Sequence, residues 1–364
     1  MYSNSQLFLI FSGLFFAAVM FSLLINSLFM RFSRTLGSRE HNADLARWSD
    51  THKPAFGGIA FFIVFLGTFA IHGALFPDLS RSWKPELFGL LAATSMGFLM
   101  GLADDAYNTR PVLKFLVQVL CGVVMIVSGT SIRVFDVTWA DHLLTIVWVV
   151  GIMNSINMLD NMDAVSSIVS IFIFSTALMA KLISEPFDSI QVLLLVGTIA
   201  ALIGFLFFNW HPSRMYMGDT GSQFLGVYLA FIGIQCFWNG HRGADHAGGM
   251  ERATITLLVF LLPIIDTTVV TINRIARGTS PFVGGRDHTT HHLSYAGLSD
   301  AQVALTFVGL STVSMFLTFV IHFLIDEWRN IHSVIFVSYA VILFLVLFLL
   351  TKRKRSNDAV PKHS

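Results

Sequence analysis

The sequence contains few charged residues and almost no cysteine. Asp, Glu, Lys and Arg make up only 12% of its 364 residues, about half the share in a typical soluble domain. The formal net charge is +1, so bulk electrostatics give no reason to expect a nucleic-acid partner. The 2 cysteines, Cys121 and Cys236, both lie within apolar segments, which argues against a disulfide framework or a thiolate metal site.

Apolar residues take the place of the missing charge. They make up 54% of the chain, which has 35 Phe and a mean hydropathy of +0.70. Lipid is therefore the expected main solvent. The first apolar stretch, Leu7 to Met30, follows uncharged residues and is longer than the ~7–15 residues of a signal-peptide core. It is predicted to remain as a spanning helix.

Stretches long enough to cross a bilayer recur along the whole sequence. A helix needs about 20 apolar residues to cross, and about 11 stretches meet that requirement. They cover approximately residues 7–30, 56–76, 86–103, 112–128, 142–158, 164–183, 190–209, 220–238, 252–272, 302–325 and 332–351. The predicted fold class is all-α, a polytopic integral membrane helical bundle. Residues 1–351 would form a single transmembrane domain, and residues 352–364 a basic tail.

Lys and Arg are divided unevenly between the two sides of this bundle. Of the 23, 7 fall on one side, Lys114 lies inside a span, and 15 fall in the set that includes 31–55, 273–301 and the tail from Lys352. The richer side should be cytoplasmic, with the N-terminus outside and the C-terminus inside. The expected location is the plasma (inner) membrane, as a multi-pass protein.

Asp104 and Asp105, which end the third span, lie on the predicted cytoplasmic side. Carboxylates at the membrane edge are costly and usually functional. Two adjacent carboxylates repel each other unless a cation neutralises them. Mg²⁺, or Mn²⁺ in its place, takes such hard oxygen ligands. The alternative is that the pair only caps a helix and marks the interface.

Asn157, Asp160 and Asp163 follow the fifth span at intervals of three. If the turn stays helical, they share one helix face, which could hold a metal or hydrogen-bond a sugar and a base. A polar loop with an Asx turn is the alternative.

Two helix starts on the same side are rich in glycine. Met217-Gly-Asp-Thr-Gly-Ser222 opens the eighth span, where Asp219 and Thr220 are plausible caps and the helix N-terminus offers N–H groups to phosphate. Lys53 precedes a Gly pair at the start of the second span, an arrangement that also suits phosphate. A simple membrane-entry turn explains it equally well.

The long loop after the ninth span contains Arg286, His288, His291 and His292. Three histidines suggest zinc, but neither a cysteine nor a second histidine cluster accompanies them. Together with Arg286 they suit a nucleotide diphosphate better, as hydrogen-bond donors.

Asp266 lies within the ninth span, about two turns from its cytoplasmic end. It is either a member of the site or a buried structural carboxylate paired with Arg274 or Arg277. Each of these motifs has a structural explanation when taken alone. Unrelated structural roles would not, however, gather all of them on one membrane face.

The motifs, in this order, resemble the polyprenyl-phosphate N-acetylhexosamine-1-phosphate transferase family. That family includes the phospho-MurNAc-pentapeptide translocases and the UDP-GlcNAc transferases that begin O-antigen, enterobacterial common antigen and teichoic acid synthesis. The resemblance runs from about residue 53 to residue 292. The motifs are Lys53-Pro-x-x-Gly-Gly, Gly101-Leu-x-Asp-Asp, Pro111-x-x-Lys114, Asn157-Met-x-Asp-x-x-Asp163, Met217-Gly-Asp-Thr-Gly-Ser222, Pro263-x-x-Asp266 and the histidine loop.

The resemblance implies Mg²⁺-dependent transfer of an N-acetylhexosamine 1-phosphate, foremost GlcNAc 1-phosphate, from a UDP-sugar to undecaprenyl phosphate, with release of UMP. It also implies a homodimer in the lipid membrane. The residues with implied catalytic roles are Asp104, Asp105, Asp160 and Asp163, and those with metal-binding roles are Asp219 and Asp104. The residues with implied substrate contacts are Lys53, Lys114, Asn157, Arg286, His288, His291 and His292, with Asp266 nearby.

The sequence departs from the family pattern at two places. Ala164 follows Asp163 where members commonly carry Gly, and the histidines read His-x-x-His-His where many members have His-x-His-His. Only His291 and His292 therefore match the family motif directly, and the correspondence of His288 is open.

Three other functions are compatible with parts of the sequence. The nearest is phospho-MurNAc-pentapeptide transfer. A secondary transporter would place carboxylates near the bilayer midplane and contain internal repeats, and neither is evident. A scaffold that binds a lipid-linked sugar without turnover would tolerate Asp104→Asn and Asp219→Asn.

Overall fold

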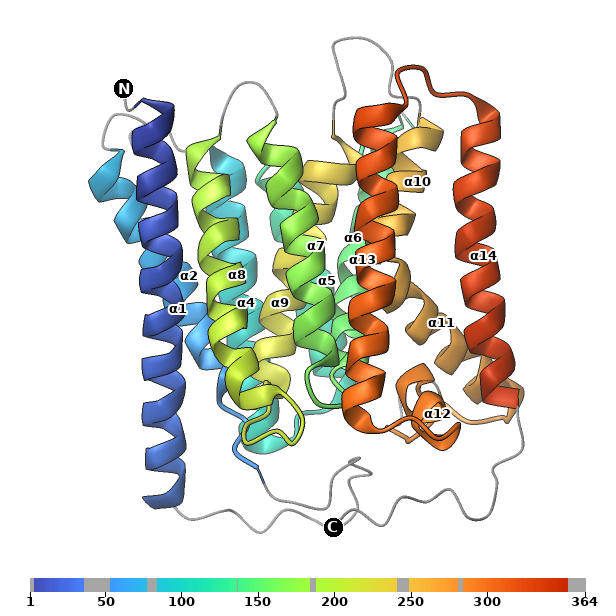
Figure 1. The fold of residues 1–364 in the computed structure, drawn as a ribbon, viewed down its shortest axis with the longest axis horizontal. Coiled ribbons are helices and arrows are strands. Elements are labelled where there is room, and N and C mark those ends of the chain that lie inside the picture. Colours follow the sequence, from blue (N-terminus) through green and yellow to red (C-terminus); the bar gives the residue numbers. More distant parts are fainter. Residues whose placement is uncertain are drawn as a thin grey trace.

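A computed structural model describes residues 3–35, 53–76, 84–135, 137–183, 188–240, 249–280 and 284–352. Within these ranges all regular elements are helices and no strand occurs. The helices run side by side, and α1 begins at the opposite end of the bundle from the end of α14 (Figure 1). The predicted all-α membrane bundle is confirmed. The tail beyond Lys352 lies outside the described residues.

The helices follow the predicted spans to within a few residues at most ends. Their bounds are α1 Asn4–Thr35, α2 Gly57–Leu75, α4 Pro85–Tyr107, α5 Pro111–Val127, α6 Thr138–Leu159, α7 Val165–Leu182, α8 Ser189–Asn209, α9 Gly218–Ile232 continued by the π-helix η1 Gly233–Trp238, α10 Gly249–Val259, α11 Leu261–Ala276, α12 Thr289–Tyr295, α13 Asp300–Leu324 and α14 Asn330–Lys352. In the described part of the chain, 9 helices are long and apolar enough to cross a membrane, and the bent pair α10–α11 makes 10. The shorter apolar helix α5 occupies the remaining predicted span.

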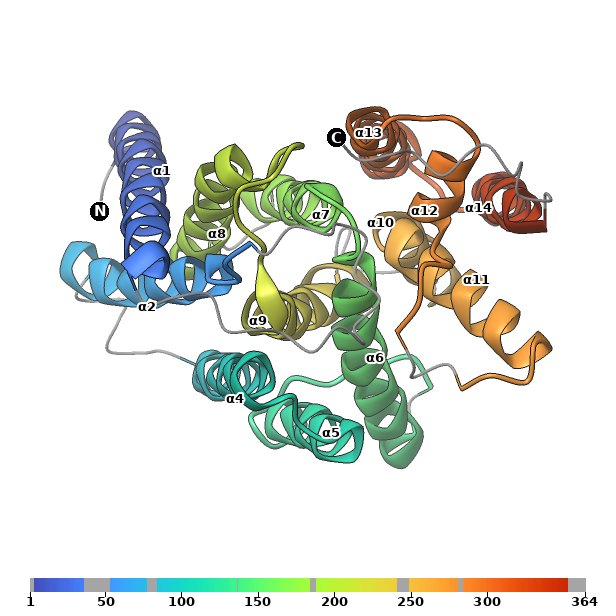
Figure 2. The same cartoon turned by 90° about the horizontal axis from the view of Figure 1, so that it is seen from below.

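Helix α9 lies near the centre of the bundle, among α2, α4, α6 and α7 (Figure 2). In its most apolar window 94% of the residues are buried, compared with 11% in α1 and 22% in α14. The outer helices therefore present apolar side chains to lipid, while α9 is enclosed by protein. Helix α9 is therefore packed against four neighbouring helices along its length.

The structure divides the predicted span 252–272 into two helices. Helix α10 ends at Val259 and α11 begins at Leu261, with a bend of 77° between them. Pro263 accounts for the break, because it has no N–H to donate to the carbonyl of Val259 and its ring would collide with that carbonyl. A further short helix, α12, lies in the loop at the lower end of the bundle (Figure 1).

Helices α2, α4 and α9 meet with almost no side chain between them at this lower end. A Cβ added to Gly58 would collide with the backbone nitrogen of Gly221, and one added to Gly101 with the carbonyl of Asp219. The N–H groups of Gly57 and Gly58 donate to the carbonyls of residues 216 and 217, at 3.2 and 3.0 Å. The start of α9 is therefore held by backbone contacts with two other helices.

Candidate functional site

A cavity of about 880 Å³ opens where α4 and α6 end and α5 and α9 begin, a volume within the range of small-molecule sites. Its lining mixes carboxylates and amides with apolar groups such as Pro111, Val112 and Phe115. The lining includes these predicted site residues: Asp104, Asp105, Lys114, Asn157, Asp160, Asp163, Asp219, His288 and His291. The structure thus brings together motifs separated by more than one hundred residues of sequence.

The ammonium of Lys114 lies between two carboxylates at one wall of the cavity. It is 2.9 Å from Oδ2 of Asp104 and 3.1 Å from Oδ2 of Asp219. The other oxygen of Asp104 accepts hydrogen bonds from the N–H and hydroxyl of Thr109, at 2.8 and 2.6 Å. Asn108 makes this possible, because its left-handed conformation (φ 50°) ends α4 and turns Thr109 back toward Asp104.

Asp219 is also joined to α6. The amide of Asn157 donates to Oδ1 of Asp219 and, at 2.8 Å, to the hydroxyl of Ser222. Asp219 therefore receives donors from two different helices, and Lys114 and Asn157 both point at the start of α9. The side chain of Asp219 faces these partners and does not cap its own helix, so the capping alternative is wrong for this residue.

The cap of α9 comes from Asp105, on α4. One carboxylate oxygen of Asp105 accepts from the N–H of Asp219 at 2.9 Å, and the other accepts from the N–H and hydroxyl of Thr220 at 2.9 and 2.6 Å. Gly218 (φ 75°) leaves room for this carboxylate, which a Cβ would meet at 2.6 Å. The adjacent residues Asp104 and Asp105 thus have different surroundings, and the hydrogen bonds of Asp105 hold the start of α9 against α4.

Asn157, Asp160 and Asp163 do not share a helix face. Helix α6 ends at Leu159, and residues 160–164 form a turn. The prediction that depended on a continuing helix is therefore wrong. Asn157 faces Asp219, whereas Asp163 turns toward the loop that precedes α9.

Asp163 holds that loop through several hydrogen bonds. Ser213 donates to it from its hydroxyl at 2.6 Å and from its N–H at 3.0 Å. Nδ1 of His211 lies 3.1 Å from the same carboxylate, and Nζ of Lys53 lies 3.9 Å away. Residue 164 then takes a left-handed conformation (φ 68°, ψ −21°), which explains why a glycine suits this position.

Lys53 lies beside the cavity but is not among its lining residues. Its ammonium donates to Ser213 at 2.9 Å and lies 5.1 Å from the centre of the Tyr216 ring. The N–H groups of the Gly pair after it are already bonded to residues 216 and 217. The Gly pair packs α2 against α9, and its N–H groups bind main-chain carbonyls instead of being available to a phosphate.

Asp266 is fully buried and binds the start of α12. Its carboxylate lies 2.8 Å from Nδ1 of His288 and accepts from the N–H and hydroxyl of Thr289, at 2.8 and 2.6 Å. The alternative partners considered for it, Arg274 and Arg277, lie elsewhere. Asp266 is therefore the residue that fixes His288 at the cavity wall.

Arg274 instead forms a two-pronged ion pair with Asp287, at 3.0 and 2.6 Å. Burial alone would raise the pKa of Asp287, but the hydrogen bonds and the charge of Arg274 outweigh it and hold that pKa below its usual range. Arg274 lines the cavity and was not predicted as a site residue.

The histidine loop contributes unequally to the site. His291 is buried against His288, and burial, helped by repulsion from His288, lowers the pKa of His291 to about 3. His292 and Arg286 are not among the lining residues, and Arg286 is exposed. Residues 281–283 of the loop lie outside the described chain.

Several polar partners of the site carboxylates were not predicted from the sequence as site residues. They include Thr109, His211, Ser213, Thr220 and Thr289. Thr220 belongs to a motif that was considered, and Thr109 lies four residues beyond the Asp pair. His211 and Ser213 follow the end of α8, and nothing in their sequence context distinguishes them from an ordinary loop.

The two carboxylates beside Lys114 are of the ligand type that a magnesium or manganese ion takes. Across the described ranges no three His, Cys, Asp or Glu side chains are grouped to hold a metal. Mg²⁺ does not require such a group, because it keeps several waters and binds through one or two carboxylates together with substrate phosphates. Asp104 and Asp219 supply two carboxylates, and the ammonium between them marks the place as one suited to positive charge.

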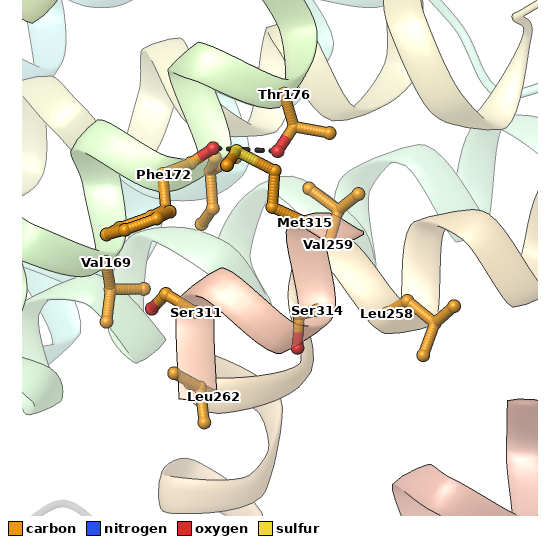
Figure 3. Close-up of a pocket in the computed structure, with 10 residues that line it drawn as sticks. Val169, Phe172, Thr176, Leu258, Val259, Leu262, Ser311, Ser314 and Met315 are labelled. Carbon is orange, nitrogen blue, oxygen red and sulfur yellow. Dashed lines mark hydrogen bonds between the residues drawn. The ribbon is translucent and has the colours of Figure 1, made fainter. Parts of the chain in front are cut away.

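A second cavity, of about 10 Å³, lies between α7, the α10–α11 bend and α13 (Figure 3). Its lining is apolar apart from hydroxyl groups, and the hydroxyl of Thr176 is bonded to the carbonyl of Phe172 at 2.8 Å. It could hold about one water molecule. Because no charged group lines it, the larger cavity is the candidate site.

Comparison with known proteins finds a family match over the part of the chain that includes α4 to α9. Residues 87–237, which include most of the cavity wall, match the family described as glycosyl transferase family 4. A probable undecaprenyl-phosphate N-acetylglucosaminyl 1-phosphate transferase of Bacillus subtilis is 25% identical, over 91% of this chain and 89% of its own.

Two further relatives extend the comparison. The decaprenyl-phosphate N-acetylglucosaminephosphotransferase of Mycobacterium tuberculosis is 24% identical over 75% of this chain and 74% of its own. A phospho-N-acetylmuramoyl-pentapeptide-transferase of Listeria welshimeri is 25% identical over 71% of this chain and 81% of its own. All three relatives are named for the transfer of a sugar phosphate.

Proposed function

Because the chain belongs to the polyprenyl-phosphate N-acetylhexosamine-1-phosphate transferase family of membrane enzymes, we propose that it transfers GlcNAc 1-phosphate from UDP-GlcNAc to undecaprenyl phosphate. An oxygen of the lipid phosphate attacks the sugar-bearing phosphorus of the donor. The bond between the two donor phosphates breaks, a new diphosphate forms on the lipid, and UMP leaves. The enzyme would work in the inner membrane with its cavity toward the cytoplasm, where a soluble UDP-sugar is available.

The observation that supports this proposal most directly is the position of Lys114 between Asp104 and Asp219. The reaction must bring two polyanions together, so its main requirement is positive charge held in a fixed place. Lys114 supplies one such charge at the cavity wall. Its side chain is 17% exposed, which leaves the ammonium accessible to a phosphate from the cavity.

The two carboxylates beside Lys114 would hold Mg²⁺ or Mn²⁺. When bound, such an ion neutralises phosphate oxygens and favours the departure of UMP. Oδ2 of Asp104 accepts a hydrogen bond from Lys114 at 2.9 Å, and both residues line the cavity. Both oxygens of Asp105 are occupied by the start of α9. If a side chain accepts a proton from the lipid phosphate, we assign that role to Asp104, because it lies beside Lys114.

The cavity's lining also suits two different substrates. Apolar side chains at the start of α5, such as Val112 and Phe115, are 69% and 48% exposed, so a prenyl chain could approach from this side. Polar side chains of α6, α11 and α12 form other parts of the wall, where a nucleotide sugar could bind. We choose GlcNAc over MurNAc-pentapeptide because the relative that aligns over 91% of the chain is named for N-acetylglucosaminyl 1-phosphate transfer.

The test is an assay of the purified protein with undecaprenyl phosphate, Mg²⁺ and one UDP-sugar at a time. UMP release and a lipid diphosphate of the matching mass are expected with UDP-GlcNAc, and neither without Mg²⁺. Turnover with UDP-MurNAc-pentapeptide alone would assign the pentapeptide branch. Binding without UMP release from any donor would refute the proposal and favour a scaffold. Asp219→Asn, which should keep the fold and lose turnover, is the control for contaminating enzyme.

A further inference from the structure

Three amide side chains form a layer inside the bundle, deeper than the charged groups of the site. This amide layer consists of Gln118 of α5, Asn154 of α6 and Gln223 of α9. Gln118 and Gln223 are 1% and 0% exposed. Gln118 and Asn154 also line the deep part of the cavity. No role has been given to this layer so far.

Each member of the amide layer shares a helix face with a residue of the site. The pairs are Lys114 with Gln118, Asp219 with Gln223, and Asn157 with Asn154. The two members of a pair are three or four residues apart, so one lies about 5 Å below the other on the same side of its helix. The site and the amide layer are therefore two consecutive levels of the same three helices.

Gln118 connects the other two amides. Its oxygen accepts from the amide nitrogen of Asn154 at 2.8 Å, and its nitrogen lies 3.3 Å from the oxygen of Asn154. The same nitrogen donates to the oxygen of Gln223 at 3.1 Å. The layer thus ties α5 to α6 and to α9 by directional hydrogen bonds.

The site joins the same three helices again one turn nearer the surface, with α5–α9 as the shared connection. Lys114 joins α5 to α9 through Asp219, and Asn157 joins α6 to the same carboxylate. A buried amide that loses its hydrogen-bond partner destabilises the fold, so the layer resists any change in the spacing of the three helices. Neutral amides also do this inside a membrane at a lower desolvation cost than charged groups would.

We propose that the amide layer is a positioning device for the transfer reaction. It holds the three helices at the spacing at which Lys114, Asp219 and Asn157 meet. Gln118 is its central member because both other amides bond to it. The inference rests on the proposed function for its kinetic test, and a second test is independent of turnover.

The kinetic test compares Gln118→Met and Gln223→Met with Gln235→Met. Met keeps the length of the side chain and removes the amide. Gln235 is the matched control, since it lies on η1, the continuation of α9, and makes only a 3.5 Å hydrogen bond to Thr130. For correctly folded protein, kcat should fall at least tenfold in both layer variants with KM for the UDP-sugar changed less than threefold, and stay within twofold in the control.

A rescue variant separates positioning from general packing. Gln118→Asn alone leaves the amides too far apart, whereas Gln118→Asn combined with Asn154→Gln restores the summed length of the pair. The kcat of the double variant should be at least fivefold higher than the kcat of Gln118→Asn alone. Equal kcat losses in the layer and control variants, or kcat unchanged in both layer variants, would overturn the proposal.

The second test measures the exposure of Lys114 directly, by reductive methylation and mass spectrometry of its peptide. Loss of the layer should free the ammonium from its carboxylates and raise its methylation rate at least threefold in Gln118→Met or Gln223→Met, whichever is obtained folded, relative to Lys84. Gln235→Met should not change it. An unchanged rate in the layer variants overturns the inference, whether or not the wild-type protein releases UMP with any donor.

Discussion

Asp105 of α4 caps the first turn of α9 through Thr220, whose N–H and hydroxyl both donate to the same carboxylate oxygen, at 2.9 and 2.6 Å. A helix usually takes its cap from the residue just before it. Here the residue before α9 is Met217, which makes no side-chain cap. The position of the site carboxylate Asp219 therefore depends on a helix more than one hundred residues earlier in the sequence.

Asp105→Asn should separate support of the fold from chemistry. The variant loses the charge at the α9 N-terminus and one good acceptor, a loss of about 1–2 kcal/mol, so its thermal midpoint in detergent should fall. Asp104→Asn should lower the thermal midpoint less than Asp105→Asn does. Its turnover should fall at least about a hundredfold, as expected for a group placed at developing charge. Differential scanning fluorimetry and UMP release measure the two effects. A fully stable Asp105→Asn protein without turnover would contradict this division.

Lys114→Met should make the site bind a divalent ion more tightly in the absence of substrate. Without the ammonium, Asp104 and Asp219 face each other uncompensated, and their attraction for a cation rises by at least about fivefold, or ~1 kcal/mol. Titration with Mn²⁺, followed by electron paramagnetic resonance, measures the affinity. Lys53→Met is the matched control, since that ammonium lies beside Asp163. Weaker Mn²⁺ binding in Lys114→Met than in the control would count against the arrangement described here.

His291 should make the folded protein sensitive to mild acid. Its pKa is about 3 in the folded chain against an ordinary value of 6.5, so the unfolded chain takes up a proton there first as the pH falls. Above about pH 7.5 His291 is neutral in both states and does not change the free energy of unfolding. Between about pH 6.5 and 3 the unfolded chain is protonated there and the folded chain is not, so the free energy of unfolding falls by up to ~1.4 kcal/mol per pH unit. The thermal midpoint of the wild type should therefore drop more steeply from pH 8 to 5 than that of His291→Gln. Parallel curves would show that His291 is not held neutral.

Ala164→Gly should raise the thermal midpoint. Ala164 has φ 68°, a left-handed conformation that costs a non-glycine residue about 1–2 kcal/mol. Glycine removes that cost, but its more flexible unfolded chain loses about 0.5–1 kcal/mol more in conformational entropy on folding. The free energy of unfolding should therefore rise by about 0.5 kcal/mol. Ala164→Val is the opposite control and should lower the midpoint. A lower midpoint for the glycine variant would mean that the buried methyl group contributes more through packing than its conformation costs.

Hydropathy alone located the spans because any helix that crosses a bilayer must be long and apolar, whether its neighbours are lipid or other helices. The break at Phe260 was not foreseen, since a proline such as Pro263 is often tolerated inside a membrane helix and only neighbouring helices decide whether the chain bends. The end of α6 was also missed. Asp160 and Asp163 have helix-like spacing, and the turn forms because Asp163 binds Ser213, a residue 50 positions away.

Gathering the motifs at one face was predictable from their order relative to the spans. The partners within that face were not. Asp104 and Asp105 are adjacent in sequence and leave the end of α4 in different directions, and their roles follow from what each direction meets. Residues such as Thr109 and Arg274 lack any pattern in sequence and are recognised only by the carboxylates that they contact.

The glycine contacts of α2, α4 and α9 bear on how this enzyme could acquire a new donor. At Gly58 and Gly101 a side chain of any size would collide with the main chain of α9, so the helix packing behind the site cannot be changed one residue at a time. On another side of the cavity, Thr267 and Thr271 of α11 are lining residues, and a side chain there can be exchanged without bringing two main chains into collision. Selection for a different sugar, natural or in the laboratory, would therefore find its productive substitutions on the α11 side.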